Sequence, residues 1–347
     1  MPAFRIYNIL RPLGWLYALG TELRNRMYDR GLLKSSSFPI PVISIGNITA
    51  GGTGKTPHTE YLAELLKDKF HISVLSRGYG RKTHGYILAD DTAGSLTIGD
   101  EPFQIKSRFA DIDVAVCEDR VNGIKTLLST RHPQVIILDD AFQHRKVNPS
   151  LNILLVDYNR NILDDTLLPA GRLRESAKGR RRADIIIVTK CPAHLTPSVT
   201  DELKSKLVVR NEQQIFFSSL EFGNIYHFNG KSAAPAVDCP VLSVTGIANP
   251  APLETELRRT HSIVKKLSFP DHHIFSKRDI AEIGKQLQSM PEGSIIITTT
   301  KDAARLSGVE ISEYIKDKIY VIPVKPVFTH DSDKFDRTIL NHIESFS

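Results

Sequence analysis

The sequence predicts an α/β protein with a P-loop, doubly wound, mostly parallel sheet, a second, smaller α/β domain and an N-terminal amphipathic helix. Short apolar runs rich in β-branched residues alternate with amphipathic helical segments, a pattern typical of repeated βα units. A glycine-rich segment lies between the first such run and the helix that follows it. The length of 347 residues exceeds the ~250–300 residues at which single cores stop growing, so we expect two domains.

The composition excludes several classes of protein. With 41% hydrophobic residues the chain can bury packed cores, so it is not disordered. Its three cysteines are far apart in the sequence, which argues against a disulfide scaffold or a structural zinc site. The net charge of +6 suits phosphorylated ligands or an anionic membrane surface as well as nucleic acid. Because the basic residues are dispersed without interleaved aromatic residues, we expect no nucleic-acid partner.

Residues 1–34 are predicted to contain an amphipathic helix. Leucines, isoleucines and aromatic residues recur there at roughly helical spacing, among several arginines. The longest uncharged stretch, Pro12 to Thr21, is much shorter than the ~20 apolar residues that span a bilayer. Two interpretations are open at this point: a helix packed on its own domain, or an interfacial helix whose arginines lie at lipid headgroups.

Six buried strands are predicted next, with helices between them. Short apolar runs bounded by glycine or polar residues are typical of strands covered on both faces. The runs are Pro41–Ile45, Ile72–Leu75, Val114–Val116, Val135–Leu138, Ile153–Val156 and Ile185–Val188. A helix is predicted over Thr56–Phe70 from its apolar spacing. Tyr86–Leu88 and Ser95–Ile98 are expected to form a β-hairpin insert, since turn residues separate them.

The strand–helix pattern begins again after about residue 220. The predicted elements are strands at Val241–Val244, Ile295–Thr298 and Tyr320–Val324, and helices near Pro252–Thr260 and Lys277–Leu287. We therefore predict a P-loop domain over residues 35–220 and a smaller C-terminal α/β domain over residues 221–347.

The most informative segment runs from Gly46 to Pro57. Its glycines allow tight turns that direct backbone N–H groups at phosphate oxygens, and the following helix adds its positive dipole end. Lys55 can reach the β- and γ-phosphates, and the Thr56 hydroxyl can ligate Mg²⁺. Thr49 replaces the first glycine of the consensus G-x-x-x-x-G-K-[ST]. The predicted nucleotide-binding residues are Thr49, Ala50, Gly51, Gly52, Thr53, Gly54, Lys55 and Thr56.

Two aspartates that follow a later strand add a metal site to the predicted nucleotide-binding loop. Asp139 and Asp140 end a later apolar strand, in the form of a Walker B element, and are predicted to hold Mg²⁺ directly or through water.

The sequence also bears on which nucleotide is bound. Guanine-binding proteins carry an aspartate in an [NT]-K-x-D sequence after a strand. Here Thr189 and Lys190 are followed by Pro192 at that position, so we expect ATP rather than GTP.

Seven segments occur together in a fixed order: Ser44–Asn47, Thr49–Pro57, Leu75–Arg81, Gly99–Pro102, Asp139–His144, Leu168–Glu175 and Phe269–His273. From about residue 4 to about residue 305 the chain thereby resembles the tetraacyldisaccharide 4′-kinase family. Three residues depart from the family pattern: Ala141 replaces a glycine, Arg172 a proline and Thr300 a glutamate. None of these changes removes a group that the chemistry needs.

This resemblance implies an enzyme of lipid A biosynthesis. Such an enzyme uses ATP and Mg²⁺ to phosphorylate the 4′-hydroxyl of tetraacyldisaccharide 1-phosphate, an acylated glucosamine disaccharide, and so yields lipid IVA. It implies a peripheral or monotopic protein on the cytoplasmic face of the bacterial inner membrane, with residues 1–34 against the anionic surface. No protein partner is predicted. Two alternatives stay open: a P-loop ATPase switch and a soluble small-molecule kinase of the same fold.

The resemblance also implies roles within the site. It places the catalytic carboxylate at Asp100 and its partner at His272, in different domains, so that domain closure could assemble the pair. Asp100 also suits a helix N-cap. Glu101 is a candidate Mg²⁺ ligand beside Thr56, Asp139 and Asp140. The candidates for contacting the substrate are Arg77, Arg120, Arg172 and His144, with Arg81 and Arg174 as further candidates for gripping phosphate oxygens.

Overall fold

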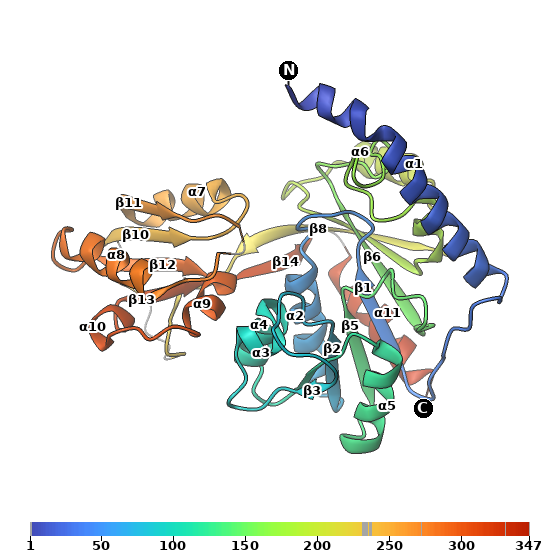
Figure 1. Ribbon diagram of the computed structural model, residues 1–347, viewed down its shortest axis with the longest axis horizontal. Helices are drawn as coiled ribbons and strands as arrows, with labels where there is room; N and C mark the ends of the chain where they lie inside the picture. Colours follow the sequence, from blue (N-terminus) through green and yellow to red (C-terminus); the bar gives the residue numbers. More distant parts are fainter. Residues whose placement is uncertain (1, 231–234, 236–237, 272, 330, 347) are drawn as a thin grey trace.

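The computed structural model describes residues 2–230, 235, 238–271, 273–329 and 331–346. Within these residues the strands form two sheets that lie side by side (Figure 1). The larger sheet has nine strands in the order β14-β8-β7-β6-β1-β5-β2-β4-β3, and the smaller has five in the order β11-β10-β12-β13-β9. The predicted α/β fold with a mostly parallel sheet is confirmed.

The large sheet contains the six strands predicted from the apolar runs. They are β1 (Val42–Gly46), β2 (Ile72–Ser76), β4 (Asp113–Val116), β5 (Val135–Asp139), β6 (Leu151–Asp157) and β7 (Ile185–Thr189). All six pair in parallel, and β8 (Gln214–Phe222) continues the parallel order beyond β7. The edge strands β3 (Ile87–Leu88) and β14 (Val324–Phe328) run antiparallel to their neighbours.

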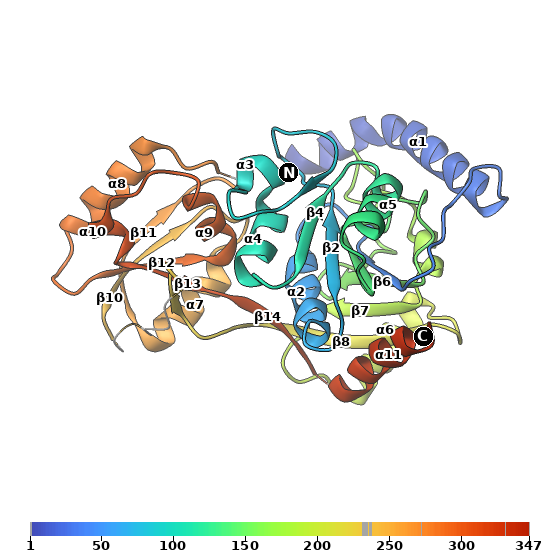
Figure 2. The same cartoon turned by 90° about the horizontal axis from the view of Figure 1, so that it is seen from below.

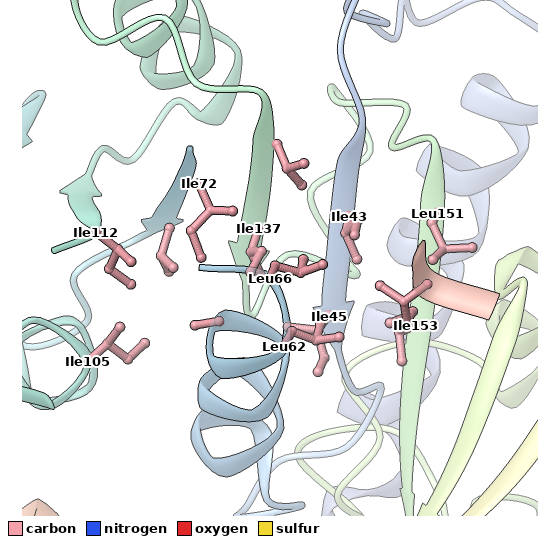
Figure 3. Packing of buried hydrophobic residues seen from close by; sticks show 14 of the residues in the cluster. Ile43, Ile45, Leu62, Leu66, Ile72, Ile105, Ile112, Ile137, Leu151 and Ile153 are labelled. Atoms are coloured by element: carbon pink, nitrogen blue, oxygen red, sulfur yellow. The ribbon is translucent and has the colours of Figure 1, made fainter. Parts of the chain in front are cut away.

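Helices cover both faces of this sheet, as expected for a doubly wound fold. They are α2 (Lys55–Leu66), α4 (Asp100–Arg108) and α11 (Ser332–Glu344) on one face, and α5 (Arg120–Thr130) and α6 (Pro197–Leu207) on the other, with a 3₁₀ turn at Ala177–Arg182. Ile43, Ile45 and Ile137 pack under α2 (Figure 3), whereas Val42 and Ile136 pack under α5. Successive residues therefore bury opposite faces of β1 and β5, which explains their uninterrupted apolar sequences.

The small sheet follows β8 in the chain. Its strands are β9 (Tyr226–His227), β10 (Pro240–Thr245), β11 (Ser262–Ser268), β12 (Ile295–Thr299) and β13 (Ile319–Ile322). Its helices are α7 (Ala251–Thr260), α8 (Lys277–Gln288), α9 (Thr300–Leu306) and α10 (Glu313–Lys316). Strands β10 to β13 pair in parallel, and β9 is antiparallel to β13. Its core is separate from that of the large sheet, with Ile280, Ile283 and Leu287 of α8 packed on Leu242 and Ile296.

The end of the chain returns to the large sheet, which differs from the expected C-terminal domain of residues 221–347. The predicted strand Tyr320–Val324 is two strands, because Pro323 has no N–H with which to continue a ladder. β13 ends before this proline, and β14 begins after it and pairs with β8. Phe335 and Ile339 of α11 are then buried in the core of the large sheet, where Phe335 packs on Phe216 of β8 and Tyr61 of α2. Residues 324–344 therefore belong to the large sheet and its helical layer.

The predicted hairpin insert is wrong. Ile87–Leu88 pairs with β4, and Ser95–Ile98 forms the short helix α3. The Thr97 hydroxyl accepts a hydrogen bond from the Gly94 N–H and donates one to the Gly94 carbonyl, both at 2.8 Å, which closes a helical turn. Gly99 then ends α3 at a φ of 92°, a conformation that favours glycine.

The predicted N-terminal helix is α1 (Pro2–Asp29), which lies across one end of the large sheet (Figures 1 and 2). One side of it contacts the large sheet's loops through hydrogen bonds from Tyr17 to the Arg174 carbonyl, from Arg24 to the Gln143 carbonyl and from Asn25 to the Glu175 carboxylate. Its other side carries side chains that are more than half exposed: Trp15, Leu16, Leu19 and Leu23. None of the helices in the described part of the chain is long and apolar enough to cross a membrane.

Gly46, at the end of the central strand β1, supplies a first prediction. A Cβ atom there would lie 2.9 Å from both the backbone nitrogen and the Cβ atom of Phe142, closer than packed atoms approach. Gly46→Ala is therefore expected to destabilise the fold by about 1–3 kcal/mol, because the Phe142 backbone must move. Thermal unfolding measures this loss. The matched control is Gly20→Ala in α1, where nothing lies within 4 Å of the added carbon, and an equal loss there would contradict the steric explanation.

Candidate active site

The glycine-rich loop lies where the sequence places it, between β1 and α2. Gly54 precedes the first residue of α2 at a φ of 85°, and Gly51 has a φ of 110°, so both adopt conformations that favour glycine. Lys55 and Thr56 form the first turn of α2, and both are buried. The loop therefore brings backbone N–H groups and a lysine to a helix N-terminus, the arrangement that binds phosphate groups.

The first half of the loop is held by the segment around Arg172. The Ala50 N–H donates to the Arg172 carbonyl at 2.6 Å, and Arg174 donates its N–H to the Ile48 carbonyl at 2.8 Å. Thr49 forms an isolated antiparallel bridge with Leu173. The extended backbone of this bridge accommodates a threonine where the consensus has glycine.

The second half of the loop is held by side chains that sequence reasoning missed. The Thr189 hydroxyl donates to the Thr53 carbonyl at 2.9 Å, and Lys190 donates to the Gly52 carbonyl while pairing with Asp157 at 2.8 Å. In the sequence, Thr189 and Lys190 indicate only an incomplete guanine-recognition motif. In the structure both side chains hold backbone carbonyl groups of the glycine-rich loop, residues 49–56, which is hereafter the phosphate loop.

His58 in α2 links the loop to β8. Burial lowers the pKa of His58 to about 4, so its ring is neutral at physiological pH. Nδ1 lies 2.7 Å from the Gly54 carbonyl, which can only accept, so Nδ1 carries the proton. Nε2 then accepts from the Ser218 hydroxyl at 3.0 Å. No sequence pattern predicted this contact.

The two predicted metal-binding aspartates lie beside the loop, because β5 pairs with β1 and places Asp139 opposite Ile45. Asp139 is fully buried; its Oδ1 accepts from the Thr59 hydroxyl at 2.8 Å, and its Oδ2 has no hydrogen-bond partner among the described residues. The pKa of Asp139 is raised to about 7, mainly by burial and to a lesser extent by the negative charges of Glu101 and Asp140. A buried, unpartnered carboxylate oxygen of this kind suits a hard cation.

Asp140 connects the loop lysine to a cavity. Its Oδ2 lies 3.7 Å from Lys55 Nζ, and Arg174 Nη1 donates to both of its carboxylate oxygens at 3.1 Å. The backbone turns at Asp140 with a φ of 47°, whereas Ala141 has no positive φ. The alanine that replaces the family's glycine therefore fits without strain.

A cavity of about 540 Å³ opens next to Asp140 and brings together most of the predicted substrate residues. Its lining includes Arg77, Arg120, His144, Glu101 and Arg174, and α1 contributes Tyr17, Thr21, Arg24 and Asn25. The Arg172 side chain is not among the described lining residues; its carbonyl instead holds the phosphate loop. Arg81 pairs with Glu118 at the cavity's edge.

Arg120 and His144 are the most unusual side chains of the cavity. Arg120 is 2% exposed, and its Nε has no hydrogen-bond partner among the described residues. Burial lowers the pKa of Arg120 to about 10, so it keeps its charge at neutral pH. Burial, followed by the charge of Arg120, lowers the pKa of His144 to about 4. Together they provide a desolvated cation beside a neutral imidazole, which suits an anionic ligand.

Asp100 is the first residue of α4, and Gly99 rather than Asp100 is its N-cap. The Asp100 Oδ2 accepts from Arg305 Nε at 2.7 Å, so it faces the small sheet. His272 lies outside the described residues. Its neighbour His273 stacks on Phe269 at 4.6 Å and pairs with Asp279 at 3.1 Å, so the His273 side chain is held between the residue that follows β11 and the first turn of α8.

A glycine-rich loop between a central parallel strand and a helix, with a buried carboxylate on the adjacent strand, defines a P-loop nucleotide-binding protein. The family model of tetraacyldisaccharide-1-P 4′-kinase matches residues 6–344. The chain belongs to this family.

Individual relatives agree with this assignment. The chain is 45% identical to the tetraacyldisaccharide 4′-kinase of Bacteroides fragilis (strain YCH46), over 98% of this chain and 94% of that protein. It is 44% identical to the Flavobacterium johnsoniae protein of the same name, over 97% of each. Among solved structures, LpxK from Aquifex aeolicus in complex with ATP superposes with a TM-score of 0.77 at 30% identity, over 97% of this chain and 99% of that one.

Proposed function

We propose that the protein transfers the γ-phosphoryl group of ATP to the 4′-hydroxyl of an acylated glucosamine disaccharide 1-phosphate and so forms lipid IVA. The observation that carries this proposal is the cavity beside the phosphate loop, walled by an N-terminal helix with an exposed apolar side. Asp140, which lies 3.7 Å from Lys55 Nζ, lines this cavity together with Tyr17, Thr21, Arg24 and Asn25 of α1. A lipid-linked sugar could enter this cavity with its acyl chains along the helix.

The nucleotide is proposed to bind at residues 49–56. Backbone N–H groups of the loop and the N-terminus of α2 would surround the phosphates, with Lys55 Nζ on the β- and γ-phosphates. The related Aquifex aeolicus protein, solved in complex with ATP, supports ATP as the donor. Contacts from Thr189, Lys190 and His58 hold the loop in place before ATP binds, which reduces the cost of ordering it.

Oxygen donors at this end of the sheet are proposed to hold Mg²⁺. The predicted ligands are Thr56, Glu101, Asp139 and Asp140, which all offer oxygen atoms. The unpartnered Oδ2 of Asp139 is the observation that favours a cation here. When bound, Mg²⁺ neutralises negative charge on the transferring phosphoryl group.

The acceptor is proposed to lie in the cavity lined by Arg77, Arg120 and His144. The desolvated Arg120 guanidinium would bind phosphate oxygens, because a charge in a low-dielectric site attracts an anion strongly. Asp100 is proposed to accept the proton of the attacking hydroxyl, with His272 as its partner. Asp100 lies next to Glu101, which lines this cavity, so the attacking hydroxyl would approach Asp100 from the cavity.

The protein is proposed to act on the cytoplasmic face of the inner membrane, with α1 at the lipid surface. Replacing the exposed residues Trp15, Leu16, Leu19 and Leu23 by serine is expected to lower binding to anionic phospholipid vesicles by ~10-fold or more. The cavity-facing residues of α1 remain intact in this variant. Co-sedimentation measures the binding, and the matched control replaces the exposed Val208 and Tyr314 by serine. Equal binding of all three proteins would remove the membrane role of α1.

The activity is tested by incubating the protein with ATP labelled at the γ-phosphate, Mg²⁺ and a tetraacylated glucosamine disaccharide 1-phosphate. Label should appear on the distal sugar of the lipid. ATP hydrolysis without transfer would instead support a P-loop ATPase switch. Transfer only to water-soluble sugars would support a soluble small-molecule kinase.

A further inference from the structure

We propose that Arg305 is a positioning residue for the transfer reaction: its guanidinium fixes the Asp100 carboxylate relative to Gly246 and Asp302 of the small sheet's layer. This inference rests on the proposed function, in which Asp100 accepts the proton of the attacking hydroxyl. Arg305 lies in α9, on the opposite side of the junction from Asp100 in α4, and α4 and α9 lie against each other (Figure 2).

Among the described residues, the Arg305 guanidinium contacts groups from three parts of the chain. Its Nε donates to Asp100 Oδ2 at 2.7 Å, and its Nη1 donates to Asp302 Oδ1 at 3.0 Å and to the Gly246 carbonyl at 2.9 Å. The residue is 4% exposed, so water competes little for these bonds. The planar guanidinium fixes the directions of its N–H groups, so two contacts on the small sheet determine where Nε points.

The small-sheet end of this bridge is rigid. Asp302 is fully buried, and its Oδ2 accepts from the Gly246 N–H at 3.0 Å and from the Thr299 hydroxyl at 2.8 Å. A Cβ atom on Gly246 would lie 3.1 Å from Asp302 and 3.4 Å from the Pro270 carbonyl and His273 Cβ. The tip of β10, the start of α9 and the chain on both sides of His272 are therefore packed as one unit around Arg305.

The large-sheet end is also fixed. Gln104 and Arg108 of α4 both donate to the Glu60 carboxylate of α2, and Glu60 is 2% exposed. The helix that begins at Asp100 is therefore tied to the helix that begins at Lys55. Arg305 thus connects a unit that contains the phosphate loop to a unit that adjoins His272.

A purely structural role for Arg305, as the counter-ion of buried Asp302, predicts different behaviour. A counter-ion of Asp302 needs only the Nη1 contacts to Asp302 and Gly246, and it does not need the contact to Asp100. The positioning role requires the Nε contact and acts through Asp100. A variant that loses both the Arg305 guanidinium and the Asp302 charge therefore distinguishes the two roles. It should keep full kcat if Arg305 is only a counter-ion, and lose kcat if Arg305 positions Asp100.

The test uses the full chain with Arg305→Gln, Arg305→Lys and the double variant Arg305→Gln/Asp302→Asn, which leaves no unpaired buried carboxylate at residue 302. We expect Arg305→Gln and the double variant to lower kcat by ~10–100-fold, since small misplacements of a reacting group cost rates of this order. The Kd for ATP should change less than about twofold, because the phosphate loop is untouched. Arg305→Lys should recover part of kcat by restoring the positive charge.

Coupling to Asp100 completes the test. In an Asp100→Asn background, adding Arg305→Gln should lower kcat by a further factor of less than ~3. The reason is that Arg305 acts through the Asp100 carboxylate, which this background lacks. The control is Arg180→Gln, a buried arginine that donates to the carbonyls of Leu207 and Ala177 and whose loss should lower only the thermal midpoint. Full kcat in the double variant, or losses that multiply with Asp100→Asn, would overturn the proposal. Absence of lipid phosphorylation by the unmodified chain would instead overturn the proposed function.

Discussion

Lys55→Met is expected to lower kcat/KM for lipid phosphorylation by about 10³-fold. Lys55 Nζ lies at the N-terminus of α2 and within 3.7 Å of Asp140, where a phosphoryl group would develop charge. Removing a preorganised charge from such a site costs ~10²–10³ in rate, and loss of ground-state binding to the phosphates adds to this. Steady-state kinetics with varied ATP measures both effects.

The thermal midpoint separates this loss from unfolding. Arg174 still pairs with Asp140 in the Lys55→Met protein, so the fold should persist. The matched control is Lys67→Met, one residue beyond the end of α2, where the lysine pairs with Glu64 and Asp68 at the surface. Near-normal turnover of Lys55→Met would show that residues 49–56 do not bind the transferring phosphate.

Asp100→Asn and His272→Ala are each expected to lower kcat by ~10²–10⁴-fold, the range typical of a lost general base. A hydroxyl group loses its proton poorly at neutral pH, so a base that accepts the proton during attack contributes strongly. If the two residues act as a unit, the double variant should be little slower than the slower single variant.

His261→Gln serves as the histidine control, because His261 lies at the end of α7 in the small sheet's layer. Rapid-quench measurement of a single turnover reports the chemical step without product release. Small losses that multiply in the double variant would contradict the proposed pair.

The large sheet was predictable because its strands are buried on both faces. A strand such as β1 or β5 reads as an unbroken apolar run, whatever the rest of the chain does. The path after β13 was not predictable in this way. Tyr320–Val324 also reads as one apolar run, and only pairing with β8, a hundred residues earlier, shows that Val324 starts a strand in the other sheet.

The candidate site also has a part that could be predicted from the sequence and a part that could not. The phosphate loop is a local feature, because its glycines, lysine and threonine are consecutive and are set by the turn that they form. The Arg305–Asp100 contact joins residues 205 positions apart, and His58 meets Ser218 across 160 positions. Such contacts leave no spacing pattern in the sequence. Arg172 and Arg174 show the limit most clearly, since both were candidates and only the structure places Arg174 in the cavity.

The pairing of β14 with β8, and the packing of Phe335 of α11 on Phe216 of β8, affect how the protein is made. A ribosome produces the small sheet's strands while the large sheet still lacks one edge strand and part of its helical cover. Phe328 and Phe335, which stack at 4.4 Å, are both synthesised after the small sheet's strands. A nascent chain halted near residue 320 would therefore leave the apolar surface around Phe216 of β8 uncovered, and chaperones that bind such surfaces would have a target until β14 and α11 are made.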